Sequence, residues 1–206
     1  MKIYIIGYGS LLNINSVQRT LKNVTYIEPI YLTHYQRSWN AIDDQSVSLS
    51  PTYLGIEYKE NATLNAVIFE IDISDLDMLD KREFLYHRVT VDKKNIKFLE
   101  NNKINITNDD KIYMYLTTNP KEPNKDYPII QSYVDTCMIG CYQLEKQFNL
   151  NTFLDDFLTT THKWSSSWVN DRIFPRAPHI HNSYAYDIDR AINKILPNYF
   201  KSITIE

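Results

Sequence analysis

Short runs of β-branched and aromatic residues dominate the first two thirds of the chain. They are separated by polar, turn-forming segments, which is the pattern that strands of a sheet leave in a sequence. Two polar segments, 101–110 and 121–128, are expected to be loops. The runs predict about six strands, at residues 2–8, 25–39, 53–58, 64–71, 86–92 and 111–117.

Helical spacing of apolar residues replaces this pattern after Pro128. Side chains three or four positions apart predict three closing helices, around residues 134–148, 153–158 and 188–195. A short earlier helix is expected in SDLDMLDKREF, where Ser74 has the side chain of an N-cap. Strands followed by helices favour an α+β fold, with a closed or curled sheet that carries helices on its outside.

Length, composition and charge indicate a single globular domain and argue against some partners. The chain has 206 residues and 43% apolar content, which is enough for one compact domain. Its 22 basic and 25 acidic residues are interspersed, so we expect no nucleic acid among its partners. We find no signal peptide and no run long enough to cross a membrane. We therefore expect a cytoplasmic protein without a membrane partner.

The cysteines and histidines do not predict a disulfide or a metal site. Cys137 and Cys141 lie four residues apart in a predicted helix, so we expect two buried thiols on one helix face. His162, His179 and His181 are too scattered for a zinc site, and we expect no metal.

The stretch IYIIGYGSLLN places Gly7 and Gly9 directly after a short apolar run, at the end of the first predicted strand. A dinucleotide fingerprint would need a third glycine where Leu12 stands, and the Gly-Lys-Ser/Thr of a P-loop is absent. A strand that ends in Gly-Tyr-Gly-Ser can instead aim successive N–H groups at an anion such as a carboxylate. A plain structural turn is the alternative, since tight turns are the commonest use of glycine.

Glu83 is the candidate acid or base. It lies seven residues after Leu76 and four after Leu79, so the helical period puts it on their buried face. Burial and the negative end of the helix should both raise its pKa, as a general acid/base near neutral pH requires. A salt bridge to Arg82 or Arg88, or a frayed last turn, would explain the same spacing.

Together these motifs resemble the gamma-glutamylcyclotransferase-like superfamily. The resemblance rests on the loop Tyr8–Leu11, on TYLGIEYKENATLNAVIFEI, and on LDKREFLYHRVTV with Glu83 and Tyr86. Tyr133, seven residues before Gly140, also matches a spacing of that superfamily. HYQRSWNA and TTHKWSSSWVNDRIFPR resemble a bacterial branch that carries an additional C-terminal helical segment.

The resemblance implies a small mixed β-barrel with flanking helices, spanning residues 1–142. Residues 143–206 would be a helical extension packed on the same domain. It also implies an enzyme of the acyltransferase or lyase type that needs no cofactor. The substrate would be a small gamma-glutamyl compound, which is cyclised to 5-oxoproline with release of an amine or amino acid.

The resemblance also assigns roles to residues. Glu83 would move the proton, and substrate would be bound by Tyr8, Gly9, Ser10, Leu11, Tyr86 and Tyr133. Two alternatives stay open from the residues alone. Glu83 could activate water in an amidohydrolase, or the loop could serve a non-catalytic protein that binds a small carboxylate.

Overall fold

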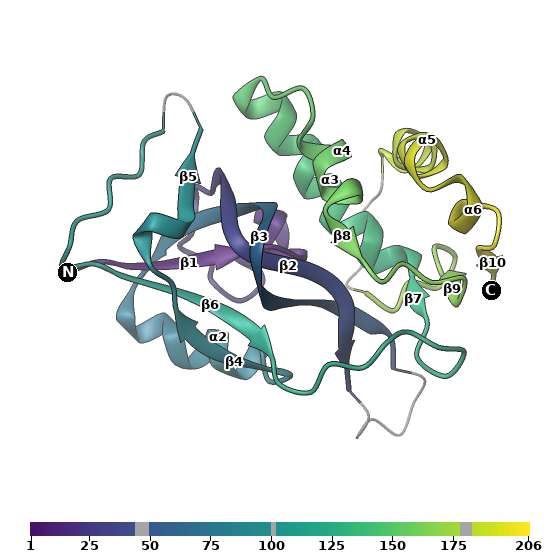
Figure 1. The fold of residues 1–206 in the computed structure, drawn as a ribbon, viewed down its shortest axis with the longest axis horizontal. Coiled ribbons are helices and arrows are strands. Elements are labelled where there is room, and N and C mark those ends of the chain that lie inside the picture. Colours follow the sequence, from purple (N-terminus) through teal and green to yellow (C-terminus); the bar gives the residue numbers. More distant parts are fainter. Residues whose placement is uncertain (44–49, 100–101, 178–182) are drawn as a thin grey trace.

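A long antiparallel hairpin forms the centre of the sheet in the computed structural model (Figure 1). Its strands are β2 (Glu28–Ile42) and β3 (Thr52–Ile71). The first strand, β1 (Ile3–Gly7), pairs antiparallel with β3, and β6 (Lys111–Thr117) pairs parallel with β1. The structure describes residues 1–43, 50–99, 102–177 and 183–206.

Three short strands extend this sheet. β4 (Tyr86–Thr90) pairs with β6, whereas β5 (Ile96–Phe98) and β8 (Thr161–His162) both pair with β2. The hydrogen-bonded order is β4-β6-β1-β3-β2-β5. The α+β class is thus confirmed. Among the described residues no pairing joins β4 to β5, the two ends of this order.

The remaining elements lie between and after these strands. The C-terminal helices gather on one side of the sheet, and α2 lies beside β4 and β6 (Figure 1). No helix in the described ranges is both long and apolar enough to cross a membrane. The helices are η1 (Ser10–Leu12), α1 (Ile14–Gln18), η2 (Ile73–Asp75), α2 (Leu76–Arg82), η3 (Lys93–Asn95), α3 (Gln131–Phe148), α4 (Phe153–Thr159), α5 (Ala185–Ile195) and α6 (Pro197–Phe200). A second, parallel sheet contains β7 (Ile129–Ile130), β9 (Trp168–Asn170) and β10 (Thr204–Ile205).

The apolar run of β1 is continuous because both faces of the strand are buried. Ile3 and Ile5 pack in the core between the sheet and the helices, whereas Tyr4 and Ile6 pack in a second core inside the curl of the sheet. Successive side chains of a strand point to opposite faces, so a strand between two cores loses the usual polar alternation. The loop after Gly7 therefore starts at the junction of the two cores.

Two local predictions were wrong. The segments 53–58 and 64–71 belong to one strand, because the polar residues between them form an irregularity where the register shifts opposite His34. Asn61 and His34 both have positive φ there. Ser74 caps no helix: it lies inside η2, whose N-cap is Asp72, and α2 begins only at Leu76.

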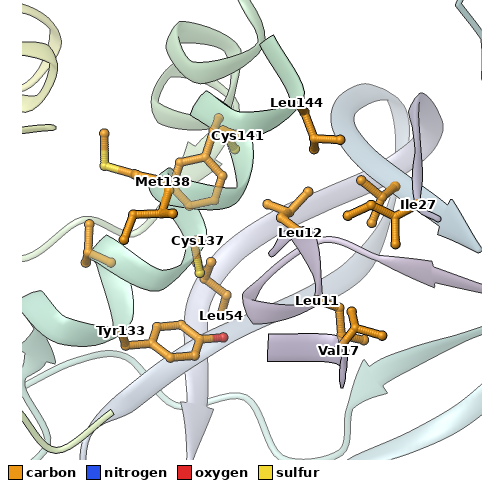
Figure 2. Packing of buried hydrophobic residues seen from close by; sticks show 14 of the residues in the cluster. Leu11, Leu12, Val17, Ile27, Leu54, Tyr133, Cys137, Met138, Cys141 and Leu144 are labelled. Carbon is orange, nitrogen blue, oxygen red and sulfur yellow. The ribbon is translucent and has the colours of Figure 1, made fainter. Parts of the chain in front are cut away.

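Packing of α3 against the sheet confirms the prediction for the cysteines. Cys137 and Cys141 are buried free thiols on the face that meets Leu12 and Leu54 (Figure 2). The helix α3 runs without a break from Gln131 to Phe148. His179 and His181 lie outside the described residues.

Candidate active site

The loop that follows β1 contains the first group of predicted site residues. Gly9 is the N-cap of η1 and makes no side-chain capping bond. The N–H groups of Ser10 and Leu11 stand at the start of this helix, where the backbone donors have no partner within the helix. The other side of the loop is fixed, because the carbonyl of Tyr8 accepts a hydrogen bond of 3.1 Å from the buried Arg37.

Two glycines let helix α3 approach this loop closely. A Cβ added to Gly140 would lie 2.5 Å from the carbonyl group of Leu12. One added to Gly9 would lie 2.9 Å from the hydroxyl oxygen of Tyr133. Figure 2 shows Tyr133 reaching from α3 toward the loop. The spacing of tyrosine and glycine along α3 therefore places a phenol over the loop and a close backbone contact about two turns later.

Glu83 lies where the helical period predicts. It is the C-cap of α2, its N–H donates to the carbonyl of Leu79 at 2.9 Å, and Leu79 is fully buried. The side chain of Glu83 is only 14% exposed. The chain turns at once into β4, since the N–H of Tyr86 donates to the carbonyl of Glu83. Burial raises the pKa of Glu83, and the neighbouring Arg82 opposes the shift without cancelling it.

Arg82 connects Glu83 to the loop. Its Nε lies 3.1 Å from Oε1 of Glu83, so one of the salt bridges anticipated from the sequence is present. Nη2 donates to the hydroxyls of Ser10 and Ser16, and Nη1 donates to the carbonyl of Ser16 and the hydroxyl of Thr20. All five N–H donors of this guanidinium are therefore engaged. Arg88 pairs with Asp80 instead of Glu83.

The three predicted tyrosines surround the carboxylate from different elements. The hydroxyl of Tyr8 donates to the carbonyl of Tyr115 at 2.5 Å, and that of Tyr86 donates to the carbonyl of Leu54 at 2.8 Å. Burial raises the pKa of Tyr8, Tyr86 and Tyr133 well above the ordinary value. Like ordinary tyrosines, all three phenols are neutral near pH 7, and burial moves their ionisation further from that range.

All the predicted site residues meet at one place. A small cavity of about 20 Å³ is lined by Tyr8, Gly9, Ser10, Leu11, Glu83, Tyr86 and Tyr133. Ser10, Glu83, Tyr86 and Tyr133 also line a wider cavity of about 290 Å³, so the small cavity is its inner end. The wider cavity approaches the size range of small-molecule sites.

Sequence reasoning missed several residues that line the wider cavity. Arg82 was anticipated only as a salt-bridge partner. Tyr53 lies on β3, and its place depends on strand pairing that no local pattern encodes. Arg176 ends the stretch TTHKWSSSWVNDRIFPR, which was interpreted only as part of a C-terminal segment, and Ala177 follows it.

Comparison with known proteins supports the fold. No family model matches the chain, and no curated protein matches it by sequence. A solved gamma-glutamyl cyclotransferase superposes with a TM-score of 0.58 at 13% identity, covering 94% of this chain and 99% of that one. The crystal structure of the uncharacterized human protein loc79017 gives a TM-score of 0.54 at 18% identity, covering 72% and 86% of the two chains. The chain therefore has a gamma-glutamyl cyclotransferase-like fold.

Proposed function

We propose that the protein is a cofactor-independent gamma-glutamyl cyclotransferase. The α-amine nitrogen of a gamma-glutamyl group attacks its own side-chain amide carbon, and the new C–N bond closes a five-membered ring. The C–N bond to the leaving nitrogen then breaks, which gives 5-oxoproline and a free amine or amino acid. Two protons pass from the attacking nitrogen to the leaving nitrogen. The α-ammonium loses one to become the nucleophilic amine and a second as the ring closes, and the leaving group departs as an ammonium, so the atoms balance without water or an oxidant.

The observation that carries this proposal is the position of Glu83. Its buried carboxylate lies on the wall of the cavity that the Tyr8–Leu11 loop closes at the inner end. A carboxyl group whose pKa is raised can be ionised in one step and protonated in the next. Glu83 would take one proton from the α-ammonium, which creates the nucleophile, and return it to the leaving nitrogen. The second proton, which the ring nitrogen loses on closure, would follow the same route through the carboxyl of Glu83.

The loop supplies a site for the glutamyl group itself. The N–H groups of Ser10 and Leu11 suit the α-carboxylate, because backbone donors at a helix start attract negative charge. Holding that carboxylate at the inner end would place the α-amine close to Glu83. Ring closure is intramolecular, so most of the required work is to fold the substrate into reacting geometry.

The buried tyrosines would complete the positioning. Tyr86 and Tyr8 already donate their hydroxyl protons to backbone carbonyls, so each offers an accepting oxygen toward the cavity. Tyr133 lies over Gly9, where it could contact the glutamyl group or the carboxyl of Glu83. Arg82 would hold Oε1 of Glu83 in a fixed orientation between the two proton transfers.

The test is product analysis with a panel of gamma-glutamyl amino acids, gamma-glutamyl amines and glutathione. Wild type is expected to release 5-oxoproline from at least one substrate, and Glu83→Gln should not. Glu60→Gln, at an exposed glutamate, is the matched control and should behave as wild type. Free glutamate in place of 5-oxoproline would show a hydrolase. Binding without turnover in both wild type and Glu83→Gln would show a non-catalytic binding protein.

A further inference from the structure

The segment Arg176–Ala177 forms part of the wall of the wider cavity, in which Glu83 also lies. The segment belongs to the C-terminal part of the chain, far in sequence from the loop and from α2. It does not line the small inner cavity, whose volume of about 20 Å³ suits the α-carboxylate of the glutamyl group alone. These two residues therefore border the wider cavity, where the rest of the substrate, including the departing group, would lie.

Buried hydrogen bonds hold this segment in place. Asp171 is 1% exposed, and its carboxylate accepts from the N–H of Arg176 at 2.8 Å and from both the N–H and the hydroxyl of Ser132. The hydroxyl of Ser132 in turn accepts from the N–H of Ala177 at 3.0 Å. A carboxylate that binds three donors, two of them from Ser132 at the start of α3, fixes the backbone of the cavity wall firmly.

Two arginines, Arg82 and Arg176, line this wall, and they differ in how many of their N–H groups are already hydrogen-bonded. Every N–H group of Arg82 contacts a partner, either Glu83 or a residue between Ser10 and Thr20. For Arg176, the structure records one side-chain partner within its described ranges, the carboxylate of Glu206, which Nη2 contacts. That carboxylate is about half exposed, and ion pairs of such exposure contribute little and exchange readily.

The other charged groups on the wall are acidic. Asp43 and Glu83 carry carboxyl groups, so neither attracts a negatively charged leaving group. An incoming carboxylate would therefore be directed to Arg176, whose planar fork matches a carboxylate with two parallel hydrogen bonds.

We propose that Arg176 binds the carboxylate of the leaving group, so that the substrates are gamma-glutamyl amino acids or peptides rather than gamma-glutamyl amines. The inference rests on the proposed cyclotransferase function. Glu206 occupies Arg176 in the free protein and yields to the substrate. Asp171 and Ser132 are positioning residues, which hold the backbone of Arg176 at the wall.

Two substrates that differ by a single group test this recognition. Gamma-glutamyl-alanine carries the carboxylate, and gamma-glutamyl-ethylamine has hydrogen in its place. We expect wild type to favour the first in kcat/KM. Arg176→Gln should lower kcat/KM for gamma-glutamyl-alanine by about tenfold to a hundredfold, the usual range for hydrogen bonds to a charged group. It should leave gamma-glutamyl-ethylamine within about twofold of wild type.

Glu206→Gln separates recognition from a merely structural role for the ion pair. If Arg176 binds substrate, removing its competitor should lower KM for gamma-glutamyl-alanine, opposite to the effect of Arg176→Gln. If the pair only braces the wall, both variants should impair both substrates alike, which would overturn the inference. Arg190→Gln, at an exposed arginine away from the cavity, is the control and should change neither substrate.

A binding measurement separates failure of this inference from failure of the proposed function. Calorimetric titration of Glu83→Gln and of Glu83→Gln/Arg176→Gln with gamma-glutamyl-alanine reports recognition without turnover. A loss of affinity confined to the double variant supports the role of Arg176 even if wild type releases no 5-oxoproline. Equal affinity in the two proteins refutes that role, whatever reaction the enzyme performs.

Discussion

Replacing Gly9 with alanine should push the hydroxyl of Tyr133 out of its place above the loop. The added Cβ would lie 2.9 Å from that oxygen, and its next neighbours, both atoms of Leu54, would lie at ordinary distances of 3.6 and 3.8 Å. Ordinary contact begins at 3.4 Å, so the phenol must move by about half an ångström. The overlap is confined to one atom, which a second substitution can remove.

The surroundings of Tyr133 make this movement costly. Its ring lies edge-on to Tyr53 and Trp39, with centroid distances of 5.1 and 5.9 Å, and the residue is 7% exposed. Overpacking in such a site costs about 1–3 kcal/mol of unfolding free energy. For a chain of this length that amounts to a decrease in Tm of roughly 2 to 12 °C.

A double-mutant cycle measures the contact directly. Wild type, Gly9→Ala, Tyr133→Phe and the double variant are unfolded by denaturant, and the four free energies of unfolding are compared. Tyr133→Phe removes the oxygen that the new Cβ meets, so the double variant should be more stable than the sum of the single effects by about 1–3 kcal/mol. Any backbone cost of alanine at position 9 is common to both backgrounds and cancels. Effects that add to within about 0.5 kcal/mol would refute this account of the loop and α3.

Three further predictions concern the charges around the site. Burial raises the pKa of Glu83 in the folded protein, so folding favours the protonated form. The free energy of unfolding should therefore fall as pH rises from the ordinary pKa to the raised one. Below that interval Glu83→Gln should have the same Tm as wild type, and above it a higher Tm. Arg82→Gln removes the group that lowers the pKa of Glu83, so the acidic limb of the kcat/KM profile should move to higher pH, and an unmoved limb would contradict the pairing. Arg37→Leu should cost several kcal/mol in denaturant unfolding. The fully buried guanidinium donates to the backbone or side chains of Tyr8, Asn65, Phe157, Thr160 and Thr161, and each buried acceptor left without a donor costs about 1–3 kcal/mol. A total loss below about 1 kcal/mol would show that these acceptors find other partners.

The position of Glu83 could be predicted because one helix face decides it. Leu79 is fully buried, and a residue four positions later on an α-helix must lie on the same side. The loop residues were predictable for a similar local reason, since glycines after a buried strand allow close approach. In both cases the signal lies within about ten residues of sequence, the range over which helical and strand periods operate.

Arg82 and Arg176 could not be assigned in this way, because their partners are distant in sequence. The donors of Arg82 reach Ser16 and Thr20, which belong to or follow a helix of five residues that leaves no periodic pattern. The N–H of Arg176 donates to Asp171, five residues earlier, but that carboxylate is itself fixed by Ser132 on α3, 39 residues before it. The continuous strand β3 was missed for the opposite reason, since the polar residues of its irregularity imitate a turn.

Helix α3 joins the two ends of the proposed substrate site. Ser132 binds the wall segment at which the leaving group would be recognised, and the next residue, Tyr133, lies over Gly9 at the glutamyl end. The backbone contact at Gly140 fixes the position of the same helix against the loop. A rigid helix therefore transmits any displacement at one end of the cavity to the other. Variants that loosen the contact of Ser132 with Asp171 should accordingly raise KM for the whole substrate, whereas changes to the Arg176 side chain should alter only the preference among leaving groups.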